Sequence, residues 1–347
     1  ASAADEEAIG TTALSVPGTD LQAEDTSREA LHPLEPHPLA RESVYLNVQD
    51  PDRRFHFVAS AAVRAGGRGE ALVALRLKDG PLLFGLDLRP PDPGESLGVG
   101  GLHVDWRPFR IRVETRLAPH DPVTFPPAPL PLLWAPRTVD VRLDLTLEPS
   151  TPAIDFCRGL PEDVLEALAP LGAHHVEQSG EWRGFAEVDG VRHEILGTGS
   201  RDHSWGRRSW DAADHWRLFT ARLRPRRGGD EVSFHALAVS VRGRRIEGGF
   251  LTRGGRAQRI TRVLFVPDPG EGAALRGFGL RLETDRGESL PLRGVVSRTL
   301  TLPVDLEKRL LRHLAGRPYR LVLHENFARY EGEGYAGHGM AETTERP

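Results

Sequence analysis

The densest group of reactive side chains in this 347-residue chain lies between Gly197 and Asp211, where charged residues alternate with tryptophans. Asp202 and His203 form a candidate acid/base centre there. A carboxyl group in a poorly solvated pocket has a raised pKa and can protonate a substrate, while a nearby imidazole orients the substrate or removes a proton elsewhere. Indole faces attract positive charge and would stabilise a cation developing on an apolar substrate. This chemistry needs no cofactor.

The predicted site contains Asp202 and His203 as catalytic residues and a surrounding set of substrate contacts. A strand with strict alternation would place Arg201 and His203 on one face and Asp202 on the other, unless a bulge at a glycine changes the register. The substrate contacts are Arg201, Trp205, Trp210, Trp216, Trp182, Glu177 and Tyr335. A purely structural interpretation stays open, in which Arg201 and Asp202 form an ion pair and the tryptophans fill a core.

Other chemistries find weaker support in the sequence. His174, His175, Glu177 and His193 are metal-ligand types, but the alternating His-x-His pattern of cupin-like sites is missing, so we expect no metal. There is no Gly-x-Ser-x-Gly nucleophile elbow and no dinucleotide fingerprint leading into a βαβ unit. The net charge of -4 does not indicate the basic surface of a nucleic-acid-binding protein. We therefore predict no cofactor and no nucleic-acid partner.

The elements that must position these residues are short strands. Glycine (37) and proline (28) are frequent, which favours many turns over long helices. Apolar and polar residues alternate from Val139 to Thr146 with the period of two of a half-buried strand. Strand-length segments fill both halves of the chain without βαβ alternation, and one helix is expected at residues 160–168 and another at Asp305–Leu314. The pattern predicts an all-β fold of two antiparallel units, as sandwiches or barrels.

The domain limits follow from changes in composition. Residues 1–40 hold eight acidic side chains against Arg28 alone and few large apolar residues, so they are expected to form a disordered acidic tail. An N-terminal β domain is predicted at 41–150, a linker with a short helix at 151–172, and a C-terminal β domain at 173–347.

Cysteine usage and hydropathy bear on location. Cys157 is the only cysteine, which excludes an intrachain disulfide and a thiolate cluster and favours a reducing compartment. No apolar run reaches the 18 residues of a membrane span. We expect a cytoplasmic protein; the sequence leaves its oligomeric state open.

The motif Gly199-Ser200-Arg201-Asp202-His203-Ser204-Trp205-Gly206 resembles the double-lipocalin family of AttH-like proteins and carotenoid 1,2-hydratases. The stretches from Glu177 to Gly190 and from Glu325 to Glu342 are similar to the same family. The resemblance implies two lipocalin-like antiparallel β-barrels packed together around a hydrophobic ligand, often an isoprenoid or a polyketide. Relatives include hydratases of isolated double bonds, terpenoid cyclases and fungal cyclases that fold polyenes in a [4+2] reaction.

Three functions remain in competition. The first is a cofactor-independent enzyme that hydrates, cyclises or isomerises a carbon–carbon double bond of a hydrophobic substrate, with Asp202 as the proton donor. The second is a non-catalytic carrier of a hydrophobic metabolite. The third is a pericyclase that folds its substrate and relies on proximity and orientation. The side chains that line the largest cavity distinguish the three, because only proton chemistry needs a buried carboxyl.

Overall fold

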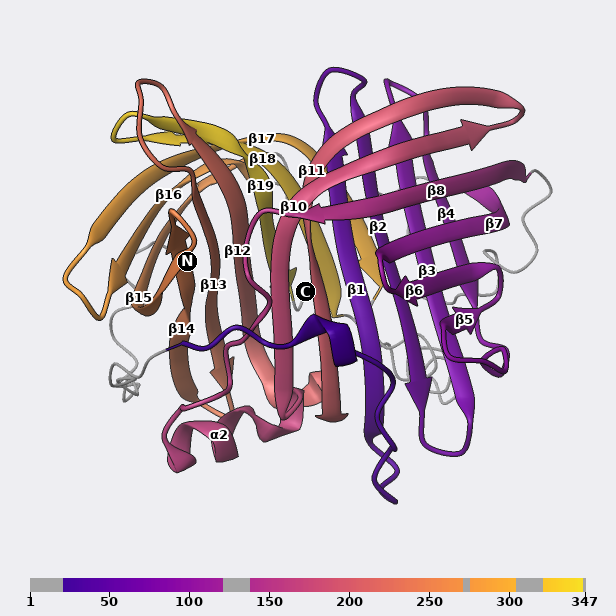
Figure 1. The fold of residues 1–347 in the computed structure, drawn as a ribbon, viewed down its shortest axis with the longest axis horizontal. Coiled ribbons are helices and arrows are strands. Elements are labelled where there is room, and N and C mark those ends of the chain that lie inside the picture. Colours follow the sequence, from indigo (N-terminus) through magenta and orange to yellow (C-terminus); the bar gives the residue numbers. More distant parts are fainter. Residues whose placement is uncertain (1–20, 121–137, 271–274, 304–320, 346–347) are drawn as a thin grey trace.

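The computed structural model describes residues 21–120, 138–270, 275–303 and 321–345, and antiparallel strands dominate it. The strands of the first unit are β1 (Ala40–Asp50), β2 (Phe55–Arg64), β3 (Arg68–Leu77), β4 (Leu82–Asp87), β5 (Leu97–Val99), β6 (Leu102–Trp106), β7 (Phe109–His120), β8 (Val139–Pro149), β9 (Ile154–Asp155), β10 (His174–Val188) and β11 (Val191–Arg207). Their order is β4-β3-β2-β1-β11-β10-β8-β7-β6-β5, and β9 pairs with β10. Pairing of β4 with β7 closes the sheet into a ring, which we call the N-terminal ring (Figure 1).

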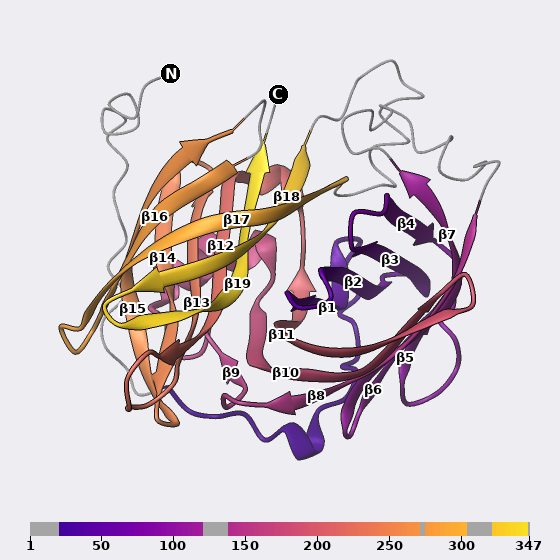
Figure 2. The same cartoon turned by 90° about the horizontal axis from the view of Figure 1, so that it is seen from above.

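The second unit is a closed barrel whose strands pair in sequence order from β12 to β19, with β12 and β19 pairing to close it, and we call it the C-terminal barrel. Its strands are β12 (Ala213–Pro225), β13 (Val232–Val241), β14 (Arg244–Arg253), β15 (Arg256–Pro269), β16 (Leu275–Thr284), β17 (Ser289–Pro303), β18 (Val322–Gly332) and β19 (Tyr335–Glu345). The two units lie side by side when the molecule is seen from above (Figure 2). The predicted all-β fold of two barrel-like antiparallel units is confirmed.

Helical structure in the described residues is short. It comprises η1 (Thr26–Arg28), α2 (Glu162–Leu168), η3 (Ala169–Leu171) and η4 (Trp210–Ala212). The helix predicted at 160–168 is confirmed as α2, whose first turn carries Glu162 and Asp163 at the positive end of the helix dipole. The helix predicted at Asp305–Leu314 lies outside the described residues.

Each unit has its own apolar core, and a third apolar layer lies between them. In β8, Val141, Leu143 and Leu145 are buried in the core of the ring, as the alternation predicts. Between the units, residues of the outer face of the ring pack against the outer face of the barrel. This layer, which we call the seam, contains Val58, Ala74, Leu82, Phe84, Leu300, Leu302, Phe327 and Met340. The interface is also hydrogen-bonded, because Gln49 Nε2 donates to the carbonyl oxygen of Gly339 at 2.7 Å.

The division between the two sheets falls after Arg207 and not at residue 173, where the sequence predicted the second domain to begin. β10 pairs with β8, and β11 pairs with β1, so this long hairpin belongs to the N-terminal ring. Without it, β1 and β8 would each expose an unpaired edge, and backbone groups at such edges need partners. Closure of the ring therefore uses β10 and β11, two strands that follow the predicted linker in the sequence.

Residues 21–39, which we call the strap, correct the expectation of a disordered tail over residues 1–40. The strap crosses the front of both units before it enters β1 (Figure 1). Its backbone N–H at Glu24 donates to the carbonyl oxygen of Ala153 at 2.8 Å. Its Glu29 carboxylate accepts from Arg201 Nη2 at 2.8 Å, and its Leu31 packs against the core of the ring. The acidic residues that suggested a disordered tail thus include Glu29, which is the counterion of a buried cation. Residues 1–20 lie outside the described residues.

We predict that Glu29→Gln destabilises the protein, because Arg201 is 1% exposed and would lose its ionised partner. Loss of one member of a buried pair costs about 3–5 kcal/mol, which lowers the melting temperature by several degrees. The matched control is Asp25→Asn, an acid of the same strap on its exposed side. Calorimetry that finds the wild-type melting temperature for Glu29→Gln as well as for the control would show that the Glu29–Arg201 pair contributes nothing to stability.

Candidate functional site

The predicted catalytic motif lies on β11, and its residues alternate strictly between two faces. The register of β11 with β1 and β10 is continuous from Thr198 to Trp205, so Gly199 is not a bulge. A Cβ atom at Gly199 would lie 1.9 Å from the carbonyl oxygen of Asn47, so only glycine permits this approach of β1 and β11. Arg201 and His203 therefore face the interior of the ring, while Asp202 faces the C-terminal barrel, as the alternation predicts.

A cavity lies between the two units. The volume within it that is open to the centres of water molecules is about 100 Å³. Its apolar walls include Leu72, Phe156, Trp210, Trp216, Leu218, Leu237, Leu302 and Leu323. Its polar lining is made of Arg41, Tyr45, Ser60, Glu70, His175, Glu177, Asp202, Arg208, Glu325 and Glu342. Aromatic and aliphatic walls with a few convergent polar groups are typical of a small-molecule site.

Two glutamates form the barrel side of the polar lining. Glu325 and Glu342 are directly opposite each other on β18 and β19. The hydroxyl of Tyr45 on β1 donates to Glu325 Oε2 at 3.0 Å, and the indole N–H of Trp216 donates to Glu342 Oε1. Within the described residues, the second oxygen of Glu325, Oε1, is buried without a hydrogen-bond partner.

The ring side of the lining comes from β10 and β11, where Glu177 is directly opposite Asp202. His175 Nδ1 lies 3.8 Å from Asp202 Oδ1. His235 of β13 contacts Glu177 Oε2 through Nδ1 at 3.0 Å and Ser179 Oγ through Nε2 at 2.8 Å. Burial lowers the pKa of His235 to about 3, so this bridging imidazole is neutral.

The four carboxyl groups differ in their tendency to ionise. Burial raises the pKa of Glu342 to about 8, although the hydrogen bond from Trp216 opposes the shift. Burial also raises the pKa of Glu325 and of Glu177 well above the usual range, helped by the charges of neighbouring carboxylates. For Asp202, burial acts in the same direction, but His175 and Arg208 outweigh it and lower its pKa. Around these four groups, the cavity thus combines an ionised Asp202 with protonated Glu177, Glu325 and Glu342.

This protonation pattern balances the charge of the cavity. Arg41 donates to Glu70 Oε1 at 3.1 Å, and although burial opposes ionisation of Glu70, the nearby arginines lower its pKa. Arg208 is the second cation, and its guanidinium donates to Ser204 Oγ at 3.0 Å. Two arginines therefore face two ionised carboxylates, Glu70 and Asp202. A neutral apolar molecule can enter without an uncompensated charge.

The other face of β11 carries a separate polar cluster inside the ring. His203 contacts Glu29 through Nδ1 at 2.9 Å and Glu42 through Nε2 at 2.8 Å. Burial lowers the pKa of His203, but the two carboxylates outweigh burial and raise it, so the ring is an imidazolium. His32 stacks on Trp205 with ring centroids 4.1 Å apart and contacts Glu42. This cluster joins the strap to the ring.

The structure separates the residues that the sequence grouped into one site. Asp202, Glu177, Trp210 and Trp216 line the cavity. Four other predicted residues face the interior of the ring from β10 and β11 and do not line the cavity: Arg201, His203, Trp205 and Trp182. Tyr335 lies at the start of β19, where its hydroxyl accepts from Arg253 and its ring packs against the barrel core.

Sequence reasoning missed Tyr45, Glu325, Glu342 and Arg208 as site residues. A signal was present for the two glutamates, because they interrupt the apolar faces of strands that carry Leu323 and Met340. A carboxyl group on such a face is expensive to bury and indicates a function. The proximity of the two glutamates to Asp202, however, depends on the packing of the two units.

Two groups of side chains have donor atoms close enough to hold a cation, with ligand atoms within 4.8 Å of one another. The first is His32, Glu42 and His203, but both nitrogens of His203 already contact carboxylates. The second is His175, Glu177 and Asp202, where a cation would require Glu177 to lose its proton. His174 contacts Asp155 at 2.8 Å and stacks on Trp205, and neither His174 nor His193 belongs to either group.

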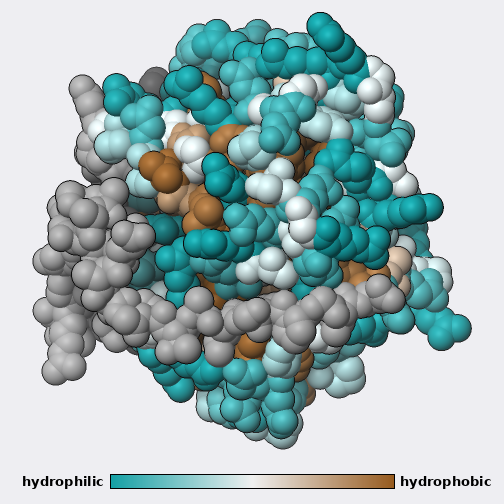
Figure 3. All heavy atoms as spheres, turned by 90° about the vertical axis from the view of Figure 1, so that its left-hand side faces the viewer, coloured by the Kyte–Doolittle hydropathy of each residue, from teal (hydrophilic) through white to brown (hydrophobic). Residues whose placement is uncertain are grey.

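Fold and site together define a double β-barrel-like protein with a cavity at the junction of its two units. The chain belongs to the family described as a domain of unknown function, DUF7064, which matches residues 25–347. No curated protein matches the chain. Among the described residues, no helix is long and apolar enough to cross a membrane. The outer face of the C-terminal barrel is mostly hydrophilic, with hydrophobic residues in a few patches (Figure 3).

Solved structures share the fold at low sequence identity. A protein assigned as AttH from Nitrosomonas europaea is 16% identical, with a TM-score of 0.57 over 88% of this chain and 92% of that one. CghA is 13% identical, with a TM-score of 0.53 over 95% and 98%, and has also been solved with Sch210972. Kievitone hydratase from Nectria haematococca is 11% identical, with a TM-score of 0.52 over 95% and 97%. The resemblance expected from the β11 motif is confirmed at the level of the fold.

We predict that Glu342→Gln changes how stability depends on pH. A carboxyl whose pKa rises from 4.5 to about 8 on folding stabilises the native state below pH 4.5, and that contribution is lost as the pH rises through 8. Glutamine keeps the acceptor for Trp216 but cannot ionise. The free energy of unfolding of the variant should equal that of the wild type at pH 5 and exceed it by about 2–4 kcal/mol at pH 9.

Denaturant unfolding at both pH values measures this difference, with the exposed Glu148→Gln as the control. If Glu342→Gln and the wild type lose stability in parallel from pH 5 to pH 9, Glu342 is already ionised in the native protein.

Proposed function

We propose that this protein is a cofactor-independent enzyme that adds a proton to a carbon–carbon double bond of an apolar substrate held between its two units. The observation that supports it is a buried carboxyl, Glu342, which accepts from the indole N–H of Trp216 in an apolar-walled cavity. A general acid must hold its proton at working pH, and burial achieves this for Glu342. The direction of the pKa shifts favours Glu342 over Asp202 as the donor.

The residues take complementary roles in this proposal. Glu342 transfers its proton to one alkene carbon, which leaves a carbocation on the other carbon and a carboxylate on Glu342. The faces of Trp210 and Trp216 stabilise the cation. In a hydration, water forms the new C–O bond and Asp202 accepts the released proton. In an isomerisation or cyclisation, the cation instead loses a proton to Asp202. Proton return to Glu342 completes the cycle.

The fold neighbours support hydration as one class of reaction, since kievitone hydratase shares the fold. CghA, another neighbour, binds the small molecule Sch210972. A pericyclase, or a carrier without catalysis, would use the same walls but would not need Glu342 as an acid. The cavity's acids therefore favour proton chemistry over both alternatives.

The experiment compares the wild type with Glu342→Gln on a panel of acyclic isoprenoid alcohols and linear polyenes. Turnover in D2O followed by mass spectrometry reports proton addition, and turnover in H2¹⁸O reports hydration. We expect Glu342→Gln to lower turnover by ~10²-fold or more, with binding of the same compounds nearly unchanged.

Glu148→Gln is the control, because it makes the same chemical change on the exposed surface. Asp202→Asn should also lower turnover, but by removing the base. Full turnover by Glu342→Gln would exclude it as the acid, and binding without label uptake across the panel would favour a carrier.

A further inference from the structure

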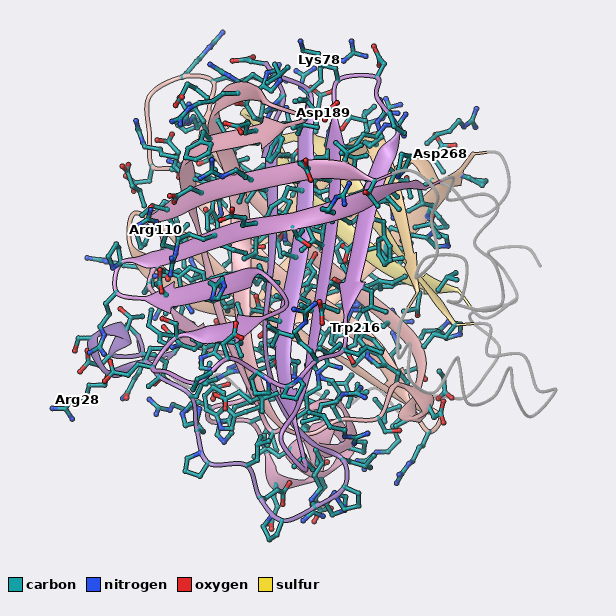
Figure 4. The ribbon with its side chains drawn as sticks, turned by 90° about the vertical axis from the view of Figure 1, so that its right-hand side faces the viewer. Arg28, Lys78, Arg110, Asp189, Trp216 and Asp268 are labelled. Atoms are coloured by element: carbon teal, nitrogen blue, oxygen red, sulfur yellow. The ribbon has the colours of Figure 1, made fainter. Side chains whose placement is uncertain are left out.

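A group of basic side chains lies at one end of the seam, away from the carboxyl cluster of the cavity. His56 and Arg76 are directly opposite each other on β2 and β3. They lie on the outer face of the ring, because Val58 and Ala74, two residues along the same strands, belong to the seam. The adjoining turn between β3 and β4 is marked by Lys78 at the upper edge of the molecule (Figure 4).

The C-terminal barrel contributes a third basic side chain to this group. The ring of His56 meets Phe327 edge-on, with centroids 5.0 Å apart. Arg298 is directly opposite Phe327 on β17 and β18, and Leu300, two residues along, also lies in the seam. The packing of the two units therefore brings Arg298 beside His56 and Arg76.

Each of these three side chains has a buried nitrogen without a hydrogen-bond partner among the described residues: His56 Nδ1, Arg76 Nε and Arg298 Nε. His56 is 6% exposed. Buried polar groups are nearly always satisfied by protein, water or an ion, so two unsatisfied guanidinium donors and an unsatisfied imidazole nitrogen in one place need an explanation. Burial, and after it the charges of Arg298, Arg76 and Arg54, lower the pKa of His56 to about 4, so this imidazole is neutral beside the guanidinium groups.

Among the described residues, the carboxylate of Asp79 lies near this group, and it does not hydrogen-bond to those nitrogens. Asp79 forms an ion pair with Arg54, and its Oδ1 lies 3.9 Å from Arg298 Nη2. Its side chain is 68% exposed, so water screens its charge. The guanidinium groups of Arg76 and Arg298 thus exceed the one nearby carboxylate, and their unsatisfied N–H donors suit an anion.

We propose that His56, Arg76 and Arg298 form a binding site for a phosphate-type oxyanion at the end of the seam. Guanidinium groups present several N–H donors in a planar fork that suits phosphate oxygens. His56 and Arg76 come from the ring and Arg298 from the barrel, so both units contribute to the site. This site is independent of the acid/base cavity and holds whether or not the proposed catalysis occurs.

The test is calorimetric titration of the full chain with inorganic phosphate, at constant ionic strength in sodium chloride. We expect saturable binding at one site per chain. Arg76→Gln and Arg298→Gln should each weaken it at least tenfold, while Asp79→Asn should strengthen it several-fold by removing the competing carboxylate. Arg112→Gln is the control, since Arg112 pairs with Asp105 on another part of the ring.

Melting temperatures give a second readout that a merely structural role would not produce. In chloride, Arg76→Gln should melt at or above the wild-type temperature, because it relieves repulsion. In phosphate, only the wild type and the control should gain several degrees. Phenyl phosphate binding more tightly than phosphate would identify a phosphate ester as the ligand, and tighter binding of the free ion would identify inorganic phosphate.

Three results would overturn the proposal. The first is a wild-type titration without saturable heat. The second is an equal response to phosphate in the wild type and Arg76→Gln. The third is acetate binding as tightly as phosphate, which would exclude selection for a phosphate-type anion.

Discussion

The pairing of β1 with β11 is the constraint on which the rest of this structure depends. Both strands are shared walls: one face of each points into the N-terminal ring, and the other points toward the C-terminal barrel. The approach of the two strands requires Gly199, because a side chain there would collide with the backbone of β1. A slip of one residue would exchange the two faces and place Asp202 inside the ring and Arg201 in the seam. The register of this pair therefore decides which residues can meet a ligand.

The two faces of β11 solve the problem of buried charge in different ways. Inside the ring, the cations Arg201 and His203 receive carboxylates from the strap and from β1, so every ionised group has a partner. In the cavity, most of the carboxyls remain neutral, and charge is kept only where an arginine compensates it. The first arrangement contributes to stability and holds the strap in place. The second leaves protons available on acids that face an apolar space, which is the condition that general acid catalysis requires.

The cavity at the junction exists because two units pack against each other. Neither unit alone contains the cavity, since its lining comes from the outer faces of both. The distant relatives share this architecture at 11–16% identity, a level at which the fold persists while site chemistry changes. The site of this chain must therefore be argued from its own carboxyls and tryptophans.

The sequence by itself determined the strands, their antiparallel arrangement and the alternation of faces along β11, because these depend on local periodicity and turn residues. It also indicated Asp202, Glu177, Trp210 and Trp216, which do line one cavity. Tertiary structure alone decided that Glu325 and Glu342 join them, that Trp182 and Tyr335 lie elsewhere, and that the strap supplies Glu29 to Arg201 over a separation of 172 residues. The physical reason is that charge compensation and ring closure act between segments remote in the chain. Periodicity describes which face a residue occupies, whereas only packing decides what that face meets.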